Sequence, residues 1–262
     1  MMHFLKTAIL LTGLAAGWGA AHAQPKPAVT PEAIEAASQL RPDDFPIGKE
    51  DAPVTVIEYA SLTCPHCAHF YKDTLPELEK KYIETGKVRF IYREYPLNEP
   101  ALKAAMVARC AGKDKYHTFT KVLFSTQDKW AFNNNFREPL EKIALLGGMT
   151  KEAFAACIAD KAVEKQILEI MKSGADAGIQ STPSFIINGT VQPGARDLAS
   201  MSAIIDPLIA VKEGKPEEKK GDEKKPEETN VEEKKEEKKD SEKKEDTTKP
   251  ESKDKELPES TE

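Results

Sequence analysis

The chain has 262 residues with 38 Lys and Arg, 44 Asp and Glu, and a formal net charge of −6, and this charge is unevenly distributed. Residues 212–262 hold 15 Lys, 20 Asp and Glu and no aromatic residue, which leaves 23 basic and 24 acidic side chains in the rest of the chain. This nearly neutral remainder argues against a basic nucleic-acid-binding surface, and its length fits one domain with an insertion rather than a multi-domain enzyme.

Residues 1–23 have the pattern of a secretory signal peptide. Lys6 is the only Lys, Arg, Asp or Glu before residue 25, and an uncharged, mostly apolar run follows it. Small residues stand at Ala21 and Ala23, so we expect cleavage after Ala23 and a periplasmic location. An uncleaved membrane anchor is the alternative, although the apolar run is shorter than the ~20 residues of a bilayer span. Residues 24–46 are expected to form a lead-in that is Pro-rich and flexible at its start.

Residues 47–98 contain two predicted strands. Residues 54–59 are β-branched and apolar, which predicts a buried strand, and residues 87–95 alternate in a way that predicts a second one. A helix is predicted between them, which implies a parallel pair with a right-handed crossover.

The predicted helix between the two strands begins beside a Cys-Pro-His-Cys motif. Apolar residues recur at helical spacing from Cys67 to Tyr82. Pro65 suits the first helical position, where no N–H group is required. Pro76 should kink this helix, and Gly86 should end it.

Residues 99–178 are helical almost throughout, which predicts a helical block inserted into an α/β frame. The candidate helices cover residues 101–110, 117–125, 138–146, 151–160 and 162–177. Residues 179–211 then return to the frame. They contain a predicted strand over 183–189 that ends in an Asn-Gly hairpin turn, a return strand from Val191, and a closing helix over 198–211.

Residues 212–262 contain only Val231 and Leu257 as aliphatic residues, so this tail is expected to be disordered. One interpretation is a solvated segment that keeps the protein in solution. The other is a spacer or a weak tether to a charged surface of the cell envelope.

The motif Cys64-Pro65-His66-Cys67 carries the clearest chemical signal. Cys64 lies at a strand-to-helix junction, where unpaired N–H groups and the helix dipole stabilise a thiolate, and His66 is placed to add to this effect. A stabilised thiolate is a good leaving group, so a Cys64–Cys67 disulfide is expected to oxidise its partners. Cys67 lies about one turn further in and is expected to be the less exposed, resolving sulfur.

Two other interpretations of this motif have less support. A structural disulfide gains little stability by closing so short a loop. A zinc site requires Cys110 and Cys157 to converge with the pair, and these two residues lack the spacing of zinc ligands, so no metal is expected. With four cysteines, the natural pairing is Cys64 with Cys67 and Cys110 with Cys157, and two free buried thiols at Cys110 and Cys157 remain an alternative.

The residues alone do not decide between two interpretations at each of two further positions. Glu58 lies in the first predicted strand, either as a buried carboxyl with a raised pKa that carries protons for the thiols or as a solvent-facing residue at a sheet edge. The Thr182-Pro183 peptide bond precedes an apolar strand, and base rates alone favour an ordinary trans bond there over a cis bond.

These residues together resemble the DsbA-type disulfide oxidoreductases. The resemblance covers roughly residues 47–211 and rests on residues 52–59, on the motif of residues 64–67 with Phe70 after it, and on residues 181–185. It implies an α/β thioredoxin fold with an inserted α-helical domain, to which the block of residues 99–178 is similar.

The resemblance also implies roles for individual residues. Cys64 is implied to be the attacking and attacked sulfur, Cys67 the resolving sulfur, and His66 the tuning residue. Pro183 is implied to be cis and to face the pair, with Thr182 before it. Glu58 matches the buried acid of the family, and Cys110 and Cys157 resemble the second disulfide of DsbA-like proteins in some bacterial lineages.

We therefore expect a monomeric periplasmic oxidase that introduces disulfide bonds into exported, unfolded polypeptides. A quinone-linked membrane partner of the DsbB kind is expected to reoxidise it, and neither a cofactor nor nucleic acid is required. A disulfide isomerase or reductase of the same fold is the first alternative, although residues 24–51 are too few for the dimerisation domain of known isomerases. A thioredoxin-fold binding module for unfolded or envelope partners is the second.

Overall fold

The structure is a computed structural model that describes residues 28–214. The predictions of a signal peptide and of a disordered tail therefore lie outside the described residues, apart from the tail's first three. Within 28–214, none of the helices has both the length and the hydropathy that crossing a membrane requires.

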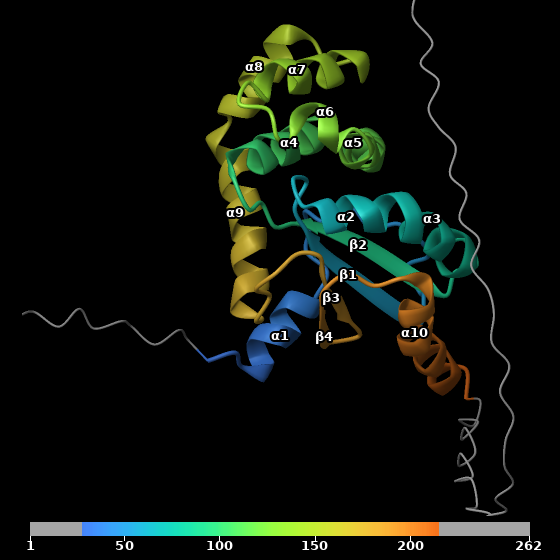
Figure 1. The fold of residues 1–262 in the computed structure, drawn as a ribbon. Helices are drawn as coiled ribbons and strands as arrows, with labels where there is room; N and C mark the ends of the chain where they lie inside the picture. The colour runs from blue at the N-terminus through green and yellow to red at the C-terminus, as the bar shows by residue number, and fades with distance from the viewer. Residues whose placement is uncertain (1–27, 215–262) are drawn as a thin grey trace, which may run out of the picture. The chain divides into compact units, whose positions relative to one another are not determined.

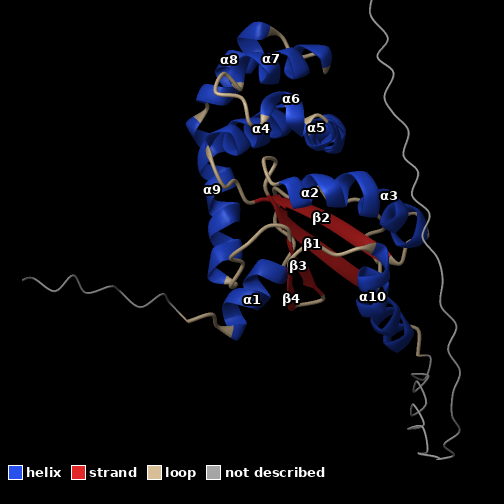
Figure 2. Cartoon of the chain, in the orientation of Figure 1, coloured by secondary structure: helices blue, strands red, loops and turns tan. Residues whose placement is uncertain are grey.

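A four-stranded sheet in the order β2-β1-β3-β4 forms the centre of the fold (Figures 1 and 2). β1 (Val54–Ala60) and β2 (Val88–Glu94) are parallel, whereas β3 (Ser184–Ile187) is antiparallel to β1 and β4 (Thr190–Pro193) is antiparallel to β3. All four strands were predicted to within one or two residues at most ends. β1 is a central strand, so it is hydrogen-bonded along both edges, to β2 and to β3.

Two groups of helices cover the two faces of this sheet. Val56 of β1 belongs to one buried cluster with Phe70 and Leu75, on the face covered by the helix that follows β1 and by α10 (Leu198–Lys212). Ile57, the next residue along β1, belongs to a second cluster on the opposite face, where α1 (Pro31–Ser38) and α9 (Lys161–Asp176) lie (Figure 1).

The helix after β1 is irregular, as the proline at its centre predicts. It runs through α2 (Pro65–His69), η1 (Phe70–Thr74), α3 (Leu75–Leu78) and η2 (Glu79–Ile83), of which the two η segments are π-helical. The N–H group of Leu75 donates to the carbonyl of Phe70, five residues back, just before Pro76 removes an N–H donor. Gly86 ends this helix with a φ of +75°, which lets the N–H group of Lys87 reach the carbonyl of Tyr82 at 2.8 Å.

All five helices predicted between the two halves of the sheet are present. They are α4 (Glu99–Cys110), α5 (Lys113–Ser125), α7 (Arg137–Leu146), α8 (Lys151–Ala159) and α9, each within four residues of its predicted bounds. A further short helix, α6 (Gln127–Trp130), was not predicted. α9 packs on α4 and continues down to β2 and α1, so it joins the inserted helices to the sheet (Figure 1).

α1 was not predicted either; it lies within the lead-in of residues 24–46, directly after the Pro-rich start. It is held to the sheet by Arg93 of β2, whose side chain is fully buried. The Arg93 guanidinium donates to the carbonyls of Ala37 and Gln39 at 2.5 and 2.6 Å and forms an ion pair with Asp44 at 2.7 Å. Much of the lead-in is thus a packed part of the fold.

Candidate active site around Cys64 and Cys67

The two cysteines of the motif lie where β1 gives way to α2. Cys64 is the N-cap residue of α2, with an extended backbone (φ −82°, ψ 120°), and Pro65 is the first helical residue, as predicted. Cys64 is 6% exposed and Cys67 is fully buried, whereas Pro65 and His66 are exposed. Both cysteines are free thiols in this structure, so it represents the reduced state.

The loop before β3 brings a second segment to Cys64. The peptide bond between Thr182 and Pro183 is cis, as the resemblance implied, and the trans interpretation is wrong. The Cys64 thiol donates to the carbonyl oxygen of Thr182 over 3.3 Å. The strand-to-helix junction and the cis-proline loop therefore meet at one sulfur atom.

The surroundings of the two sulfur atoms push their pKa values in opposite directions. A hydrogen bond from the Cys67 thiol is the largest cause that lowers the pKa of Cys64, from 9.0 to about 5, against the opposing effect of burial. The Thr182 side chain and the backbone N–H groups of Cys67 and His66 lower it further. Burial raises the pKa of Cys67 far above its ordinary value, and the hydrogen bond to Cys64 adds to this, as does the negative charge of Glu58 whenever that carboxyl group is ionised.

Glu58 is fully buried in the middle of β1, between Tyr92 of β2 and Phe185 of β3. The sheet-edge interpretation is therefore wrong. Neither carboxyl oxygen has a hydrogen-bond partner within the described part of the chain. Burial, and then the negative charge of Cys64, raise the pKa of Glu58 well above 4.5, so the site favours the protonated carboxyl group.

Two contacts from the inserted helices to the loop before Cys64 were not predicted. The side-chain Nε2 of Gln127 donates to the carbonyl oxygens of Leu62 and Cys64, at 2.8 and 3.0 Å. The Thr63 hydroxyl donates to Oδ1 of Asn98, the N-cap residue of α4, at 3.2 Å. These partners are 35 to 65 residues apart in the sequence, and no local pattern marks a lone Gln or Asn as a partner of a distant loop.

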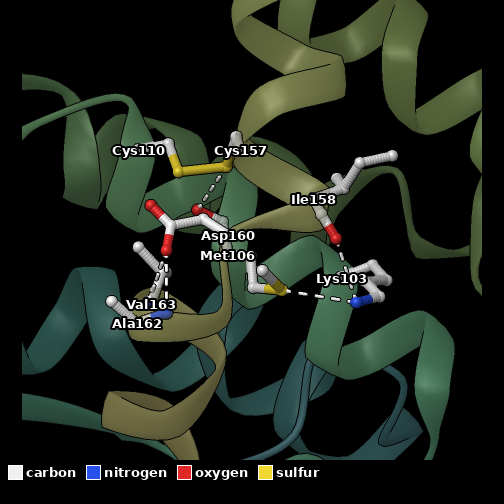
Figure 3. The surroundings of a disulfide bond; sticks show 8 residues. All are labelled: Lys103, Met106, Cys110, Cys157, Ile158, Asp160, Ala162 and Val163. Atoms are coloured by element: carbon white, nitrogen blue, oxygen red, sulfur yellow. Dashed lines mark hydrogen bonds between the residues drawn. A yellow bond between two sulfur atoms is a disulfide. The ribbon is translucent and has the colours of Figure 1, made fainter.

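The second cysteine pair forms a disulfide that joins two inserted helices (Figure 3). Cys110 ends α4 and Cys157 lies within α8, with Cα atoms 6.1 Å apart. Sγ of Cys157 also lies 3.2 Å from the carbonyl oxygen of Met106, in a buried contact with α4. Because these cysteines are bonded to each other, the zinc alternative and the free-thiol alternative are both wrong.

A cleft lies beside the exposed His66. It has a volume of about 290 Å³ and is lined by residues of α2 and η1 on one side and by the segment that leads into α10, including Arg196, on the other. It places mixed polar and apolar surface next to the end of α2 that carries Cys64.

The comparisons with known proteins agree with this geometry. A thioredoxin family model matches residues 41–207. A Rickettsia felis protein with the name "Putative protein-disulfide oxidoreductase" is 35% identical over 198 residues, which cover 75% of this chain and 69% of that protein.

Solved structures show the same similarity. Alpha-DsbA1 of Wolbachia pipientis is 34% identical with a TM-score of 0.63, over 68% of this chain and 96% of that one. BdbD of Bacillus subtilis, at 22% identity and a TM-score of 0.58 over 64% of this chain and 93% of that one, shares the fold. On the family match, the Rickettsia relative, the similarity to alpha-DsbA1 and the two sulfur atoms at the end of β1, this chain belongs to the DsbA-type protein-disulfide oxidoreductases of the thioredoxin superfamily.

Proposed function

We propose that this protein is a periplasmic oxidase that donates the Cys64–Cys67 disulfide to exported, unfolded polypeptides. The observation that carries the proposal is the asymmetry of the pair: Cys64 lies at the helix N-terminus among several hydrogen-bond donors, and Cys67 is buried. An environment that stabilises the Cys64 thiolate stabilises the reduced protein, which makes the disulfide form an electron acceptor. The predicted signal peptide over residues 1–23 supports export.

The exchange has two steps. A client thiolate attacks Sγ of Cys64, which forms a client–Cys64 disulfide and breaks the bond to Cys67. A second client thiolate then attacks the client sulfur of this mixed disulfide and releases Cys64 as a thiolate. Two electrons pass from the client to the protein, and the client gains one disulfide bond.

The sulfur of Cys67 leaves the first step as a thiolate in a buried environment, where an anion is costly. Its raised pKa favours the protonated thiol, so this sulfur requires a proton. Burial favours the protonated form of the neighbouring Glu58, so we assign Glu58 the supply of that proton.

The cleft beside His66 offers the client chain a surface that begins two residues after Cys64 in the sequence. After the exchange, a quinone-linked membrane partner of the DsbB kind accepts the two electrons and restores the disulfide. In this proposal the protein acts as a monomer and needs no prosthetic group.

Denaturant melts of the reduced and oxidised protein test the direction of electron flow. We expect the reduced form to be the more stable, with a glutathione equilibrium that favours the dithiol. A more stable oxidised form would instead indicate a reductase or isomerase.

The catalytic role of Cys64 is tested by oxidation of reduced, unfolded ribonuclease by wild type and Cys64→Ala. We expect the variant to be inactive, because it cannot form the mixed disulfide. Equal activity of the two proteins would indicate a binding module whose redox chemistry is incidental.

A further inference from the structure

Gln127 connects the inserted helices to the backbone of the active-site loop. It is the first residue of α6, and its side chain is almost completely buried. Its single Nε2 group donates both of its protons to this loop, to the carbonyl oxygens of Leu62 at 2.8 Å and Cys64 at 3.0 Å.

We propose that Gln127 is a positioning residue for thiol–disulfide exchange, which holds these two carbonyl groups so that the first N–H groups of α2 point at Sγ of Cys64. This inference rests on the proposed role of Cys64 as the attacked sulfur. It assigns part of the active-site chemistry to a residue that touches neither sulfur atom.

The geometry of Cys64 explains why its carbonyl group matters. Cys64 is the N-cap residue, and its backbone angle ψ sets where its side chain lies relative to the N–H groups of His66 and Cys67. The same angle sets the direction of its carbonyl. Pro65 has no N–H group, so only the later residues of this turn serve as donors.

Two donors hold the carbonyl oxygen of Cys64. One is the N–H group of Ala68 at 3.1 Å, an ordinary helical bond within α2. The other is Gln127, which comes from outside this helix. Loss of Gln127 leaves the helical bond alone to define the direction of the carbonyl, and it leaves the carbonyl of Leu62 without this donor.

Electrostatics point the same way. Carbonyl oxygens carry partial negative charge, which disfavours a nearby thiolate, and the effect is strong where water is excluded. The two N–H bonds of Gln127 offset that charge at both carbonyls. The N–H groups of His66 and Cys67, which lower the pKa of Cys64, depend on the same backbone.

Trp130 provides a matched control on the same short helix. It is fully buried, and its Nε1 donates to the carbonyl of Leu123 at 2.9 Å, which lies within the inserted helices. Trp130→Phe removes one buried hydrogen bond from α6 without removing a donor from the active-site loop. Gln127→Met removes the amide group and keeps a side chain of similar length.

The test measures the pKa of Cys64 in the reduced proteins, from thiolate absorbance against pH, together with the glutathione equilibrium. We expect Gln127→Met to raise this pKa by about half a unit to one unit and to weaken the protein as an oxidant about three- to tenfold. Trp130→Phe should lower stability and leave the pKa unchanged. An unchanged pKa in Gln127→Met overturns the inference, as does an equal rise in both variants.

Two further outcomes separate this inference from the proposed function. A wild-type Cys64 that titrates like an ordinary thiol refutes the proposed oxidase, whereas a low wild-type pKa that Gln127→Met does not change refutes only the role of Gln127. If Gln127→Met does not fold, the side-chain amide resonances of Gln127 are followed in the wild type. They should shift with the midpoint of Cys64, and a constant position overturns the inference.

Discussion

Sγ of Cys64 lies 3.3 Å from the carbonyl oxygen of Thr182, a residue 118 positions further along the chain. The hydroxyl group of the same threonine is buried and has no hydrogen-bond partner among the described residues of the reduced thiol form, and the Thr182 side chain lowers the pKa of Cys64. Thr182 thus serves both protonation states: its carbonyl accepts from the thiol, and its hydroxyl is free to donate to the thiolate.

Thr182→Val tests the hydroxyl half of this arrangement, because valine keeps the shape and loses the donor. We expect the pKa of Cys64 to rise by about half a unit to one unit, since one hydrogen bond to the anion is lost. The reduced protein is then less favoured, so the glutathione equilibrium shifts toward the disulfide. Thr182→Ser keeps the hydroxyl and should stay near wild type. A Val variant with wild-type pKa would show that the hydroxyl does not reach the thiolate.

His66 acts on Cys64 through its backbone N–H group as well as through any effect of its exposed ring. His66→Pro removes both, and His66→Ala removes only the ring. We expect His66→Pro to raise the pKa of Cys64 and to make the protein more reducing, with a smaller change in His66→Ala. The rate of Cys64 alkylation as a function of pH measures the pKa of Cys64 in both variants. Equal shifts in the two variants would assign the whole effect to the ring.

The reduced protein should gain stability over the oxidised one as the pH rises. Cys64 has a folded pKa of about 5 against an ordinary value of 9.0. A depressed pKa contributes stability that is complete above the unfolded value and is lost as the pH falls through the folded one. Urea melts of both redox states near pH 5 and near pH 9 measure the difference. If the difference in stability between the reduced and oxidised proteins is the same near pH 5 and near pH 9, the pKa of Cys64 is not lowered.

The local parts of the site could be predicted from the sequence because they depend on neighbouring residues. Strand residues 54–59, a cysteine and Pro65 together define a strand-to-helix junction, and the thiolate position follows from the geometry of a helix N-terminus. All of the inserted helices except the short α6 could likewise be predicted from the spacing of their apolar residues. Their ends were displaced by up to four residues. Side-chain caps at Asn98 and Asp160 accompany displacements of two residues and one at the starts of α4 and α9. The four-residue displacement is at the start of α5, where the N-cap residue Gly112 has no side chain to mark it.

The remaining parts depend on pairings between distant residues. The burial of Glu58 follows from β3, which returns from position 184 to lie on the second edge of β1. α1 is fixed by Arg93 rather than by its own weak pattern. Gln127 is positioned by helix packing, which a single sequence does not reveal.

The disulfide between Cys110 and Cys157 should stabilise the fold by constraining the unfolded chain. It closes a loop with a sequence separation of 47, for which the chain-entropy model gives at most about 4 kcal/mol. Cys110→Ala with Cys157→Ala should therefore lower the free energy of unfolding by up to that amount in urea melts. An unchanged stability would mean that the bond does not constrain the unfolded state. A changed Cys64 pKa in the same variant would show that the bond also acts on the redox site.

Glu58→Gln should increase stability only above the ordinary pKa of a glutamate. In the unfolded chain the Glu58 carboxyl has the ordinary pKa of 4.5, whereas burial raises this pKa well above that value in the folded protein. A raised pKa contributes stability that is complete below the unfolded value and is lost as the pH rises toward the folded one. Wild type therefore loses up to about 1.4 kcal/mol per pH unit in this range, and the glutamine variant does not.

Urea melts of oxidised wild type and oxidised Glu58→Gln measure the difference in stability between the two proteins. The oxidised form is used because disulfide-bonded cysteines do not titrate. Just below pH 4.5 the two proteins should be similar in stability, and the variant should become increasingly the more stable at higher pH. Glu77→Gln, at an exposed position of α3, is the control and should show no growing gap. A constant difference between wild type and Glu58→Gln across the range would mean that Glu58 ionises in the folded protein as readily as in the unfolded chain, which would contradict its role as the proton donor to Cys67.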